Sequence, residues 1–160
     1  MAYRSTGPTG QIGSTGQNGV VGIAQYIQTV QFPNDSVPPG TAFSFDTTVF
    51  NNTSISSGSG SGGTVFTLPA GLYLIDYEMS LGSAGSVAIY KGPNSGSLAI
   101  DTQTVAGSST ATTWIHGRAI EFVSTTLVVA ISSVVGTATV VTAGNNAGNF
   151  MIRITFLKLS

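Results

Sequence analysis

The stretch TVFTLPAGLYLIDYEMSL, residues 64–81, decides the fold of this chain. Its two apolar runs, TVFTL and LYLIDYEMSL, are rich in β-branched and aromatic residues that alternate with polar ones. This alternation is typical of β-strands that bury one face. The Pro-Ala-Gly between the runs, at residues 69–71, has the composition of a tight turn. The stretch therefore predicts a strand, a turn and a second strand.

The same period-two alternation recurs along most of the chain. It predicts further strands at residues 26–32, 41–45, 86–92, 97–107, 110–123, 126–135, 137–143 and 150–160, with loops at 33–40 and 51–63. No long segment keeps apolar residues at three- and four-residue spacing, so we expect no helix. About eight to ten short strands at this spacing favour a sandwich or jelly roll. Residues 150–160 are apolar on both faces, which suits a strand buried inside an oligomer.

The N-terminal segment has a different period. Glycine recurs at every third position from residue 7 to residue 22, and only glycine fits at the axis of a collagen triple helix. A flexible Gly/Thr linker is the alternative. Only Pro8 stiffens the triplets, so we expect the stub to depend on the rest of the chain to hold three strands together. We predict two parts: a lead with six collagen-like triplets at 1–24, and a β domain at 25–160. The triplet glycines are Gly7, Gly10, Gly13, Gly16, Gly19 and Gly22.

Charge and hydropathy narrow the class of protein. The chain has 160 residues, of which only 7% are charged, against about 25% in ordinary domains. The net charge of −1 leaves no basic patch for nucleic acid. No apolar run approaches the roughly 18–20 residues that would span a bilayer. The mean hydropathy of +0.31 therefore indicates that apolar surface is buried between subunits of an oligomer.

Residues with catalytic or metal-binding chemistry are few. The chain has no cysteine, and His116 is its single histidine, so we predict no metal site and no cofactor. The alternative is a metal site on the axis of a trimer, formed by three copies of His116. Asp76 and Glu78 share a strand face, which an exposed surface explains as well as acid–base catalysis does. We predict that the chain is not an enzyme.

Two short motifs are interpreted without a binding role, the glycine motif as a flexible loop and the asparagine patterns as ordinary turn chemistry. Gly58, Gly60 and Gly63 fit G-x-G-x-x-G, but a strand follows where dinucleotide binding requires a helix. Three Asn-x-Ser/Thr patterns, which begin at Asn34, Asn51 and Asn52, fit the acceptor pattern for N-glycosylation. We interpret them as ordinary turn chemistry. The first residues, MAYRSTGPTG, contain no apolar h-region, so we expect export without the general secretion route, as in spore coats and virions.

Three stretches together resemble the C1q/TNF-like superfamily, and among its members the collagen-like glycoproteins of Bacillus spore surfaces. They are AFSFD at 42–46, TVFTLPAGLYLIDYEMSL at 64–81, and FMIRITFLKLS at 150–160. The resemblance implies a jelly-roll protomer in a tight homotrimer, with the stubs leaving together near the axis. It implies glycosylation of Thr9 and Thr15, and no enzymatic activity. The residues that match the core signature are Phe43, Phe66, Pro69, Gly71 and Tyr73.

The function hypothesis combines the resemblance with the shortness of the stub. We expect a structural trimer that builds or decorates a filament on the extracellular surface of a spore, in the exosporium or an appendage. Each stub would dock into the next trimer head-to-tail, since a heterologous contact that does not close makes a filament. The partners would be other copies of the chain and other spore-surface proteins. The alternatives are a virion fibre or spike, and a receptor- or glycan-binding head that uses the loop at 51–63.

Overall fold

A computed structural model describes residues 19–29, 36–60, 62–110, 113–135, 138–139 and 152–160. In these ranges the chain is almost entirely β-structure, with one short 3₁₀ turn, η1. This confirms the all-β prediction. The elements are β1 (Gly22–Gln28), β2 (Ser36–Val37), β3 (Thr47–Asn51), β4 (Ser56–Gly60), β5 (Gly63–Leu81), β6 (Gly85–Gly92), β7 (Ala99–Ile100), η1 (Thr102–Thr104), β8 (Ala106–Ser108), β9 (Thr113–Val135), β10 (Ala138–Thr139) and β11 (Ile152–Lys158).

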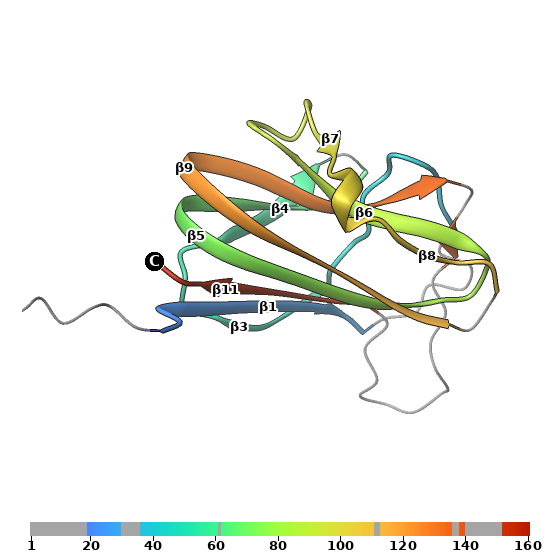
Figure 1. Ribbon diagram of the computed structural model, residues 1–160, viewed down its shortest axis with the longest axis horizontal. Helices are drawn as coiled ribbons and strands as arrows, with labels where there is room; N and C mark the ends of the chain where they lie inside the picture. Colours follow the sequence, from blue (N-terminus) through green and yellow to red (C-terminus); the bar gives the residue numbers. More distant parts are fainter. Residues whose placement is uncertain (1–18, 30–35, 61, 111–112, 136–137, 140–151) are drawn as a thin grey trace, which may run out of the picture.

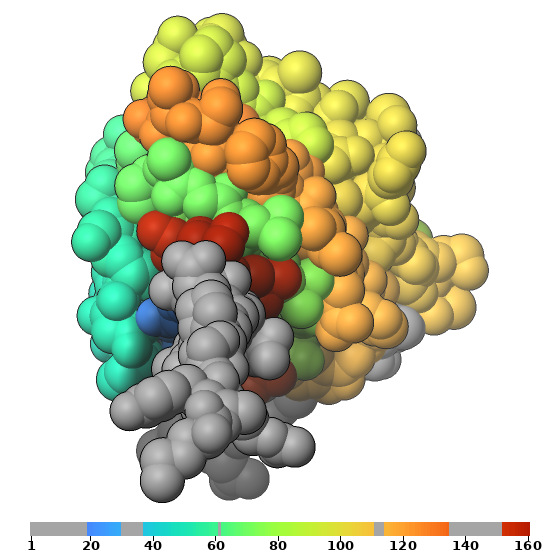
Figure 2. Space-filling model, turned by 60° about the vertical axis from the view of Figure 1, so that its left-hand side comes forward, coloured from blue at the N-terminus to red at the C-terminus, as the bar shows by residue number. Residues whose placement is uncertain are grey.

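The strands form one antiparallel sheet that folds over onto itself. Its order is β3-β1-β11-β5-β9-β6-β7, while β4 pairs with β5, β8 pairs with β6, and β2 and β10 form a separate small ladder. Figure 1 shows β1, β3 and β11 on one side of the sandwich and β4, β6 and β7 on the other. The long strands β5 and β9 bend and contribute to both sides. In Figure 2 the red β11 lies against the green β5, which lies against the orange β9.

The Pro-Ala-Gly at residues 69–71 is a bulge, so the predicted turn is wrong. The β5–β9 ladder continues through it, with a register shift between Pro69 and Gly71. Proline lacks an N–H to donate and is tolerated in strands at bulges. Gly71 has φ of +154°, and a Cβ there would lie 2.5 Å from the Ser160 carbonyl oxygen. The stretch that decides the fold is therefore one bent strand, and its bend is what closes the sandwich.

Other predicted boundaries also change in the structure. β9 runs unbroken where two strands were expected at 110–123 and 126–135, because it pairs with β5 from Thr113 to Val129 and with β6 from Val128 to Val135. The predicted loop at 51–63 contains β4, whose backbone pairs with the start of β5. The predicted strand at 41–45 forms only an isolated bridge, between Ala42 and Ser132.

The predicted strand at 97–107 is interrupted by η1. The Asp101 carboxylate accepts a hydrogen bond from the Gln103 N–H at 3.1 Å, which turns the chain into the 3₁₀ helix. The Thr104 hydroxyl then donates to the Asp101 carbonyl oxygen at 2.8 Å. These local side-chain bonds compete with the sheet ladder for the backbone.

An aromatic cluster fills the centre of the sandwich. The Phe66 ring is fully buried and lies 4.7 Å from the Tyr26 ring, 5.2 Å from Phe45 and 5.2 Å from Phe156. Tyr77 is also fully buried, and its single hydroxyl proton is shared between the carbonyl oxygens of Thr104 at 2.7 Å and Val87 at 3.1 Å. Burial raises the pKa of Tyr77, which keeps this hydroxyl a donor.

Asn51 holds the connection between β3 and β4 by hydrogen bonds. Its amide nitrogen donates to the Ile55 carbonyl oxygen at 2.7 Å and to the Tyr26 hydroxyl at 2.9 Å. Its side-chain oxygen accepts from the Thr53 N–H and hydroxyl, both at 3.0 Å. The structure thus supports the interpretation of Asn51 as turn chemistry.

Substituting Asn51 tests this role. Asn51→Ala is expected to lower the free energy of unfolding by about 1–3 kcal/mol, because Ile55 and Thr53 lose partners in a partly buried site. Urea titration at fixed protein concentration measures the change. Asn94→Ala is the control, since the Asn94 side-chain oxygen accepts from Gly96 and Ser97 within its own exposed turn. Equal losses in both variants would contradict the prediction.

Candidate functional site

The most distinctive surface is the solvent side of the four strands β1, β11, β5 and β9. Their ladders align the outward side chains in rows that cross the sheet. We call this surface the outer face. It comprises Ile23, Gln25, Ile27, Arg153, Thr155, Leu157, Leu72, Leu74, Asp76, Glu78, Trp114, His116, Arg118, Ile120 and Phe122.

One half of the outer face is apolar. A complete row crosses all four strands as Ile23, Leu157, Leu74 and Ile120. The next row toward the bulge pairs Leu72 with Phe122. Ile120 is 70% exposed and Phe122 is 77% exposed. Contiguous apolar surface of this kind marks an interaction site on a folded protein.

The other half of the outer face carries two ion pairs. Arg118 donates from Nε and an Nη to the Asp76 carboxylate, at 2.8 and 2.6 Å. Arg153 pairs with Glu78 at 2.5 Å. Asp76 and Glu78 thus face arginines from the neighbouring strands, which makes them structural partners and argues against an acid–base pair.

His116 is exposed on the same face and stands opposite Glu78 in the β5–β9 ladder. It lines a shallow hollow together with Trp114, Asp76 and Arg118. Among the described residues, no group of three or more His, Cys, Asp or Glu side chains is placed to hold a metal ion. In the same ranges, no helix has the length and apolar character needed to cross a membrane.

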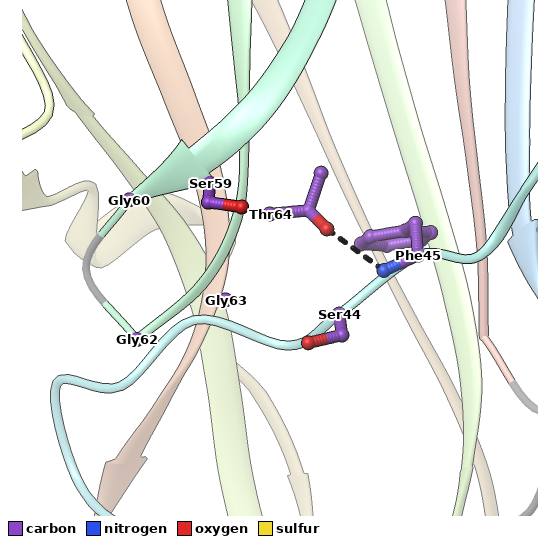
Figure 3. Close-up of a pocket in the computed structure, with 7 residues that line it drawn as sticks. All are labelled: Ser44, Phe45, Ser59, Gly60, Gly62, Gly63 and Thr64. Atoms are coloured by element: carbon purple, nitrogen blue, oxygen red, sulfur yellow. Dashed lines mark hydrogen bonds between the residues drawn. The ribbon is translucent and has the colours of Figure 1, made fainter.

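Two larger hollows also lie on the surface, and the second of them borders the outer face at Arg118 and Ile120. One of about 570 Å³ lies beneath the β4–β5 hairpin, where Thr64 Oγ1 accepts from the Phe45 N–H at 2.9 Å (Figure 3). Its lining is hydroxyl groups, glycine backbone and the Phe45 ring, with no charged side chain. The Gly58-Gly60-Gly63 motif belongs to this hairpin: Gly58 and Gly60 lie in β4 and Gly63 begins β5, so the predicted loop is wrong, and the predicted strand after the motif is confirmed. The other hollow, of about 500 Å³, lies between η1 and β9 and includes Lys91, Asp101 and Glu121.

The signature residues gather in and around the core. Phe43, Phe66 and Tyr73 are buried, with exposed fractions of 1% or less. Pro69 and Gly71 form the bulge. The Phe43 N–H donates to the Ile131 carbonyl oxygen at 2.8 Å, which ties the segment before β3 to β9. Phe43, Phe66 and Tyr73 belong to one core cluster, so these residues shape the fold.

The collagen-like triplets lie mostly outside the described residues. Gly7, Gly10, Gly13 and Gly16 and both candidate glycosylation residues, Thr9 and Thr15, fall there, as does Asn34. Gly19 is exposed with φ of +122°. Gly22 is the first residue of β1 and pairs with Lys158. The last triplet thus enters the sheet.

Solved structures identify the fold. The globular domain of zebrafish complement 1qA aligns with a TM-score of 0.59 and 9% identity, covering 87% of this chain and 98% of that one. Murine APRIL aligns with a TM-score of 0.55 and 10% identity (86% and 98% covered) at pH 8.0, and with 0.52 and 14% (86% and 98%) at pH 8.5. No protein-family model and no curated protein sequence matches this chain. The domain therefore has the C1q/TNF-like jelly-roll fold.

Sequence reasoning missed the outer face and the cluster of Lys91, Asp101 and Glu121. A usable signal existed for the first: Trp114, Ile120 and Phe122 all occupy even positions of β9, whereas the odd positions from 115 to 123 are buried or partly buried. No signal existed for the second, because its three residues come from β6, the N-cap of η1 and β9 and meet only in the folded sandwich.

Proposed function

We propose that this chain is a structural, non-enzymatic protein that assembles into a homotrimer through its outer face. The main support for this proposal is the apolar half of the outer face, where the side chains of Ile120 and Phe122 project from β9 into solvent. Burying apolar side chains is worth about 25 cal/mol per Å² removed from water. Such surface on a chain with so few charges favours association over solubility as a monomer.

A second apolar patch supports a closed ring. Val49 and Phe50 on the edge strand β3 are 50% and 52% exposed, and β1, β11 and β5 lie between β3 and β9 in the sheet. Contact between different patches of identical chains is heterologous, and it closes into a ring when the rotation allows. The resemblance to C1q/TNF-like proteins favours three copies.

The place where the stub joins supports a role in filaments. The Val21 N–H donates to the Lys158 carbonyl oxygen at 2.7 Å, so the chain enters the sheet beside the C terminus (Figure 1). The apolar half of the outer face lies at this same end. In a trimer packed through the apolar half, the three N-terminal stubs would leave the domains side by side. We propose that each bundle of stubs docks into the next trimer and builds a filament on a spore surface.

Deleting the stub tests this function. Full-length protein is expected to form filaments in negative-stain electron microscopy, whereas a variant lacking residues 1–19 is expected to give discrete three-chain particles. The deletion stops before Val21 because Val21 is bonded to β11. The double variant T9A/T15A is the control, since it removes only the candidate glycosylation residues and should keep the filaments.

The possible outcomes separate the parts of the proposal. Filaments that persist without residues 1–19 would refute docking by the stub. Monomers in every preparation would refute the trimer. Antibodies against the protein are expected to label filaments on spores of the source organism, and labelling confined to another structure would refute the location.

A further inference from the structure

Three ionisable side chains meet at one open edge of the sandwich. Lys91 Nζ lies 2.9 Å from an Asp101 carboxylate oxygen and 2.5 Å from a Glu121 carboxylate oxygen. The three residues come from β6, from the residue before η1, and from β9. The side chains of both acids are only 14% exposed and that of Lys91 is 33% exposed.

Lys91 and Glu121 occupy strand positions whose side chains point toward the interior of the sandwich. Lys91 follows the buried Val87 and Ile89 at two-residue spacing along β6. Glu121 precedes the buried Val123 with the same spacing along β9. The Asp101 N–H donates to the Ile89 carbonyl oxygen at 2.8 Å, which fixes the acid beside Lys91. Three of the chain's eleven charged residues are thus directed toward the gap between the two layers.

We propose that Lys91 and Asp101 form an intramolecular amide cross-link, with Glu121 as the proton-transfer residue. In this step the neutral Lys91 amine attacks Cγ of the protonated Asp101 carboxyl. Glu121 takes a proton from the nitrogen and returns it to the departing hydroxyl. The Nζ–Cγ bond forms, a Cγ–O bond breaks, and one water leaves. The condensation is balanced without an oxidant, a reductant or a cofactor.

The fixed geometry of the cluster lowers the barrier to the condensation of Lys91 with Asp101. The resting pair is ionised, because the hydrogen bond from Lys91 lowers the pKa of Asp101, and the bonds to both acids outweigh burial and raise the pKa of Lys91. One proton transfer along the 2.9 Å hydrogen bond gives the neutral pair that condenses. Effective concentrations of about 10⁵–10⁸ M in well-oriented pairs favour a single slow turnover that happens once in the life of the chain.

The cross-link would tie β6 to the segment after β7. β6 and β7 lie at the end of the sheet order, where β7 pairs with β6 through two residues and β8 pairs with β6 through three. A covalent bond over ten positions closes this margin as a disulfide would, in a chain with no cysteine. The inference rests on the geometry of the cluster and is independent of the proposed function.

Intact-mass spectrometry of the denatured full-length protein tests the proposal. The wild type is expected to weigh about 18 Da less than its sequence, the mass of one water. Trypsin is expected to leave the chain uncut after Lys91, so that residues 5–118 stay in one fragment. This second readout distinguishes the cross-link from dehydration elsewhere. Unmodified mass in both fresh and aged protein would overturn the proposal.

Three variants and one matched control sharpen the test. Lys91→Arg and Glu121→Gln are expected to keep the full mass of their sequences, the first without an amine and the second without a proton acceptor. Asp101→Asn is expected to lose about 17 Da, because ammonia replaces water as the leaving group. Lys158→Arg is the matched control and should retain the 18 Da loss. A loss of 18 Da that survives Lys91→Arg would refute the assignment.

Discussion

Replacing Phe122 by Asp is expected to convert the assembled protein into monomers. Phe122 is 77% exposed, so the substitution leaves the core of the protomer intact. In an assembly built on the outer face, the new carboxylate would be buried without a partner, which costs several kcal/mol. Because each step of about 1.4 kcal/mol is a factor of ten, association should weaken more than about 100-fold.

Mass photometry at nanomolar to micromolar concentration measures this effect. Val105→Asp is the matched control, because Val105 is a comparably exposed apolar residue at 43% and lies away from the outer face, after η1. The control is expected to assemble as the wild type does. Circular dichroism should show the same β-structure in both variants. Three-chain particles of Phe122→Asp at every concentration would exclude the apolar half of the outer face as the interface.

Truncating Phe66 is expected to produce the largest loss of stability of any single substitution in the core. Its ring contacts three others, so Phe66→Ala leaves a cavity at the point where both layers meet. Phenylalanine-to-alanine changes in cores cost about 3–5 kcal/mol. That is a large fraction of the roughly 5–15 kcal/mol that holds a typical domain folded.

Urea unfolding at fixed protein concentration measures the loss, since assembly otherwise adds to the apparent stability. Phe66→Leu is the control and is expected to lose less than half as much, because leucine fills most of the space. Phe50→Ala tests specificity, since Phe50 is half exposed and its truncation removes little buried area. A cost below about 1 kcal/mol for Phe66→Ala would contradict the central place of this ring in the core.

The outer face shows why a strand pattern gives only part of a surface. The sequence predicts which side chains of β9 share a face, because alternate residues point the same way. It does not predict that Ile120 stands beside Leu74, and Leu74 beside Leu157, because ladder register depends on pairing between distant segments. With Ile23 of β1 beside Leu157, the complete apolar row exists only once four strands are aligned.

The long strands show the same limit for turns. Pro69 and Gly71 have the composition of a turn, and local chemistry predicts one. In the folded chain β9 offers partners on both sides of these residues, so the ladder continues and the stretch becomes a bulge. The 3₁₀ turn after Asp101 is the opposite case, since a side-chain cap interrupts a pattern that reads as a continuous strand.

The sequence by itself determined the all-β class, the signature residues of the core and the glycine period of the N-terminal stub. Those properties follow from local composition and spacing, which act over a few residues. The tertiary structure alone decided the bend in β5, the apolar row of the outer face and the meeting of Lys91 with Asp101 and Glu121. Each of these depends on which distant strands pair and in what register, and the free energy that selects the register is that of the whole buried core.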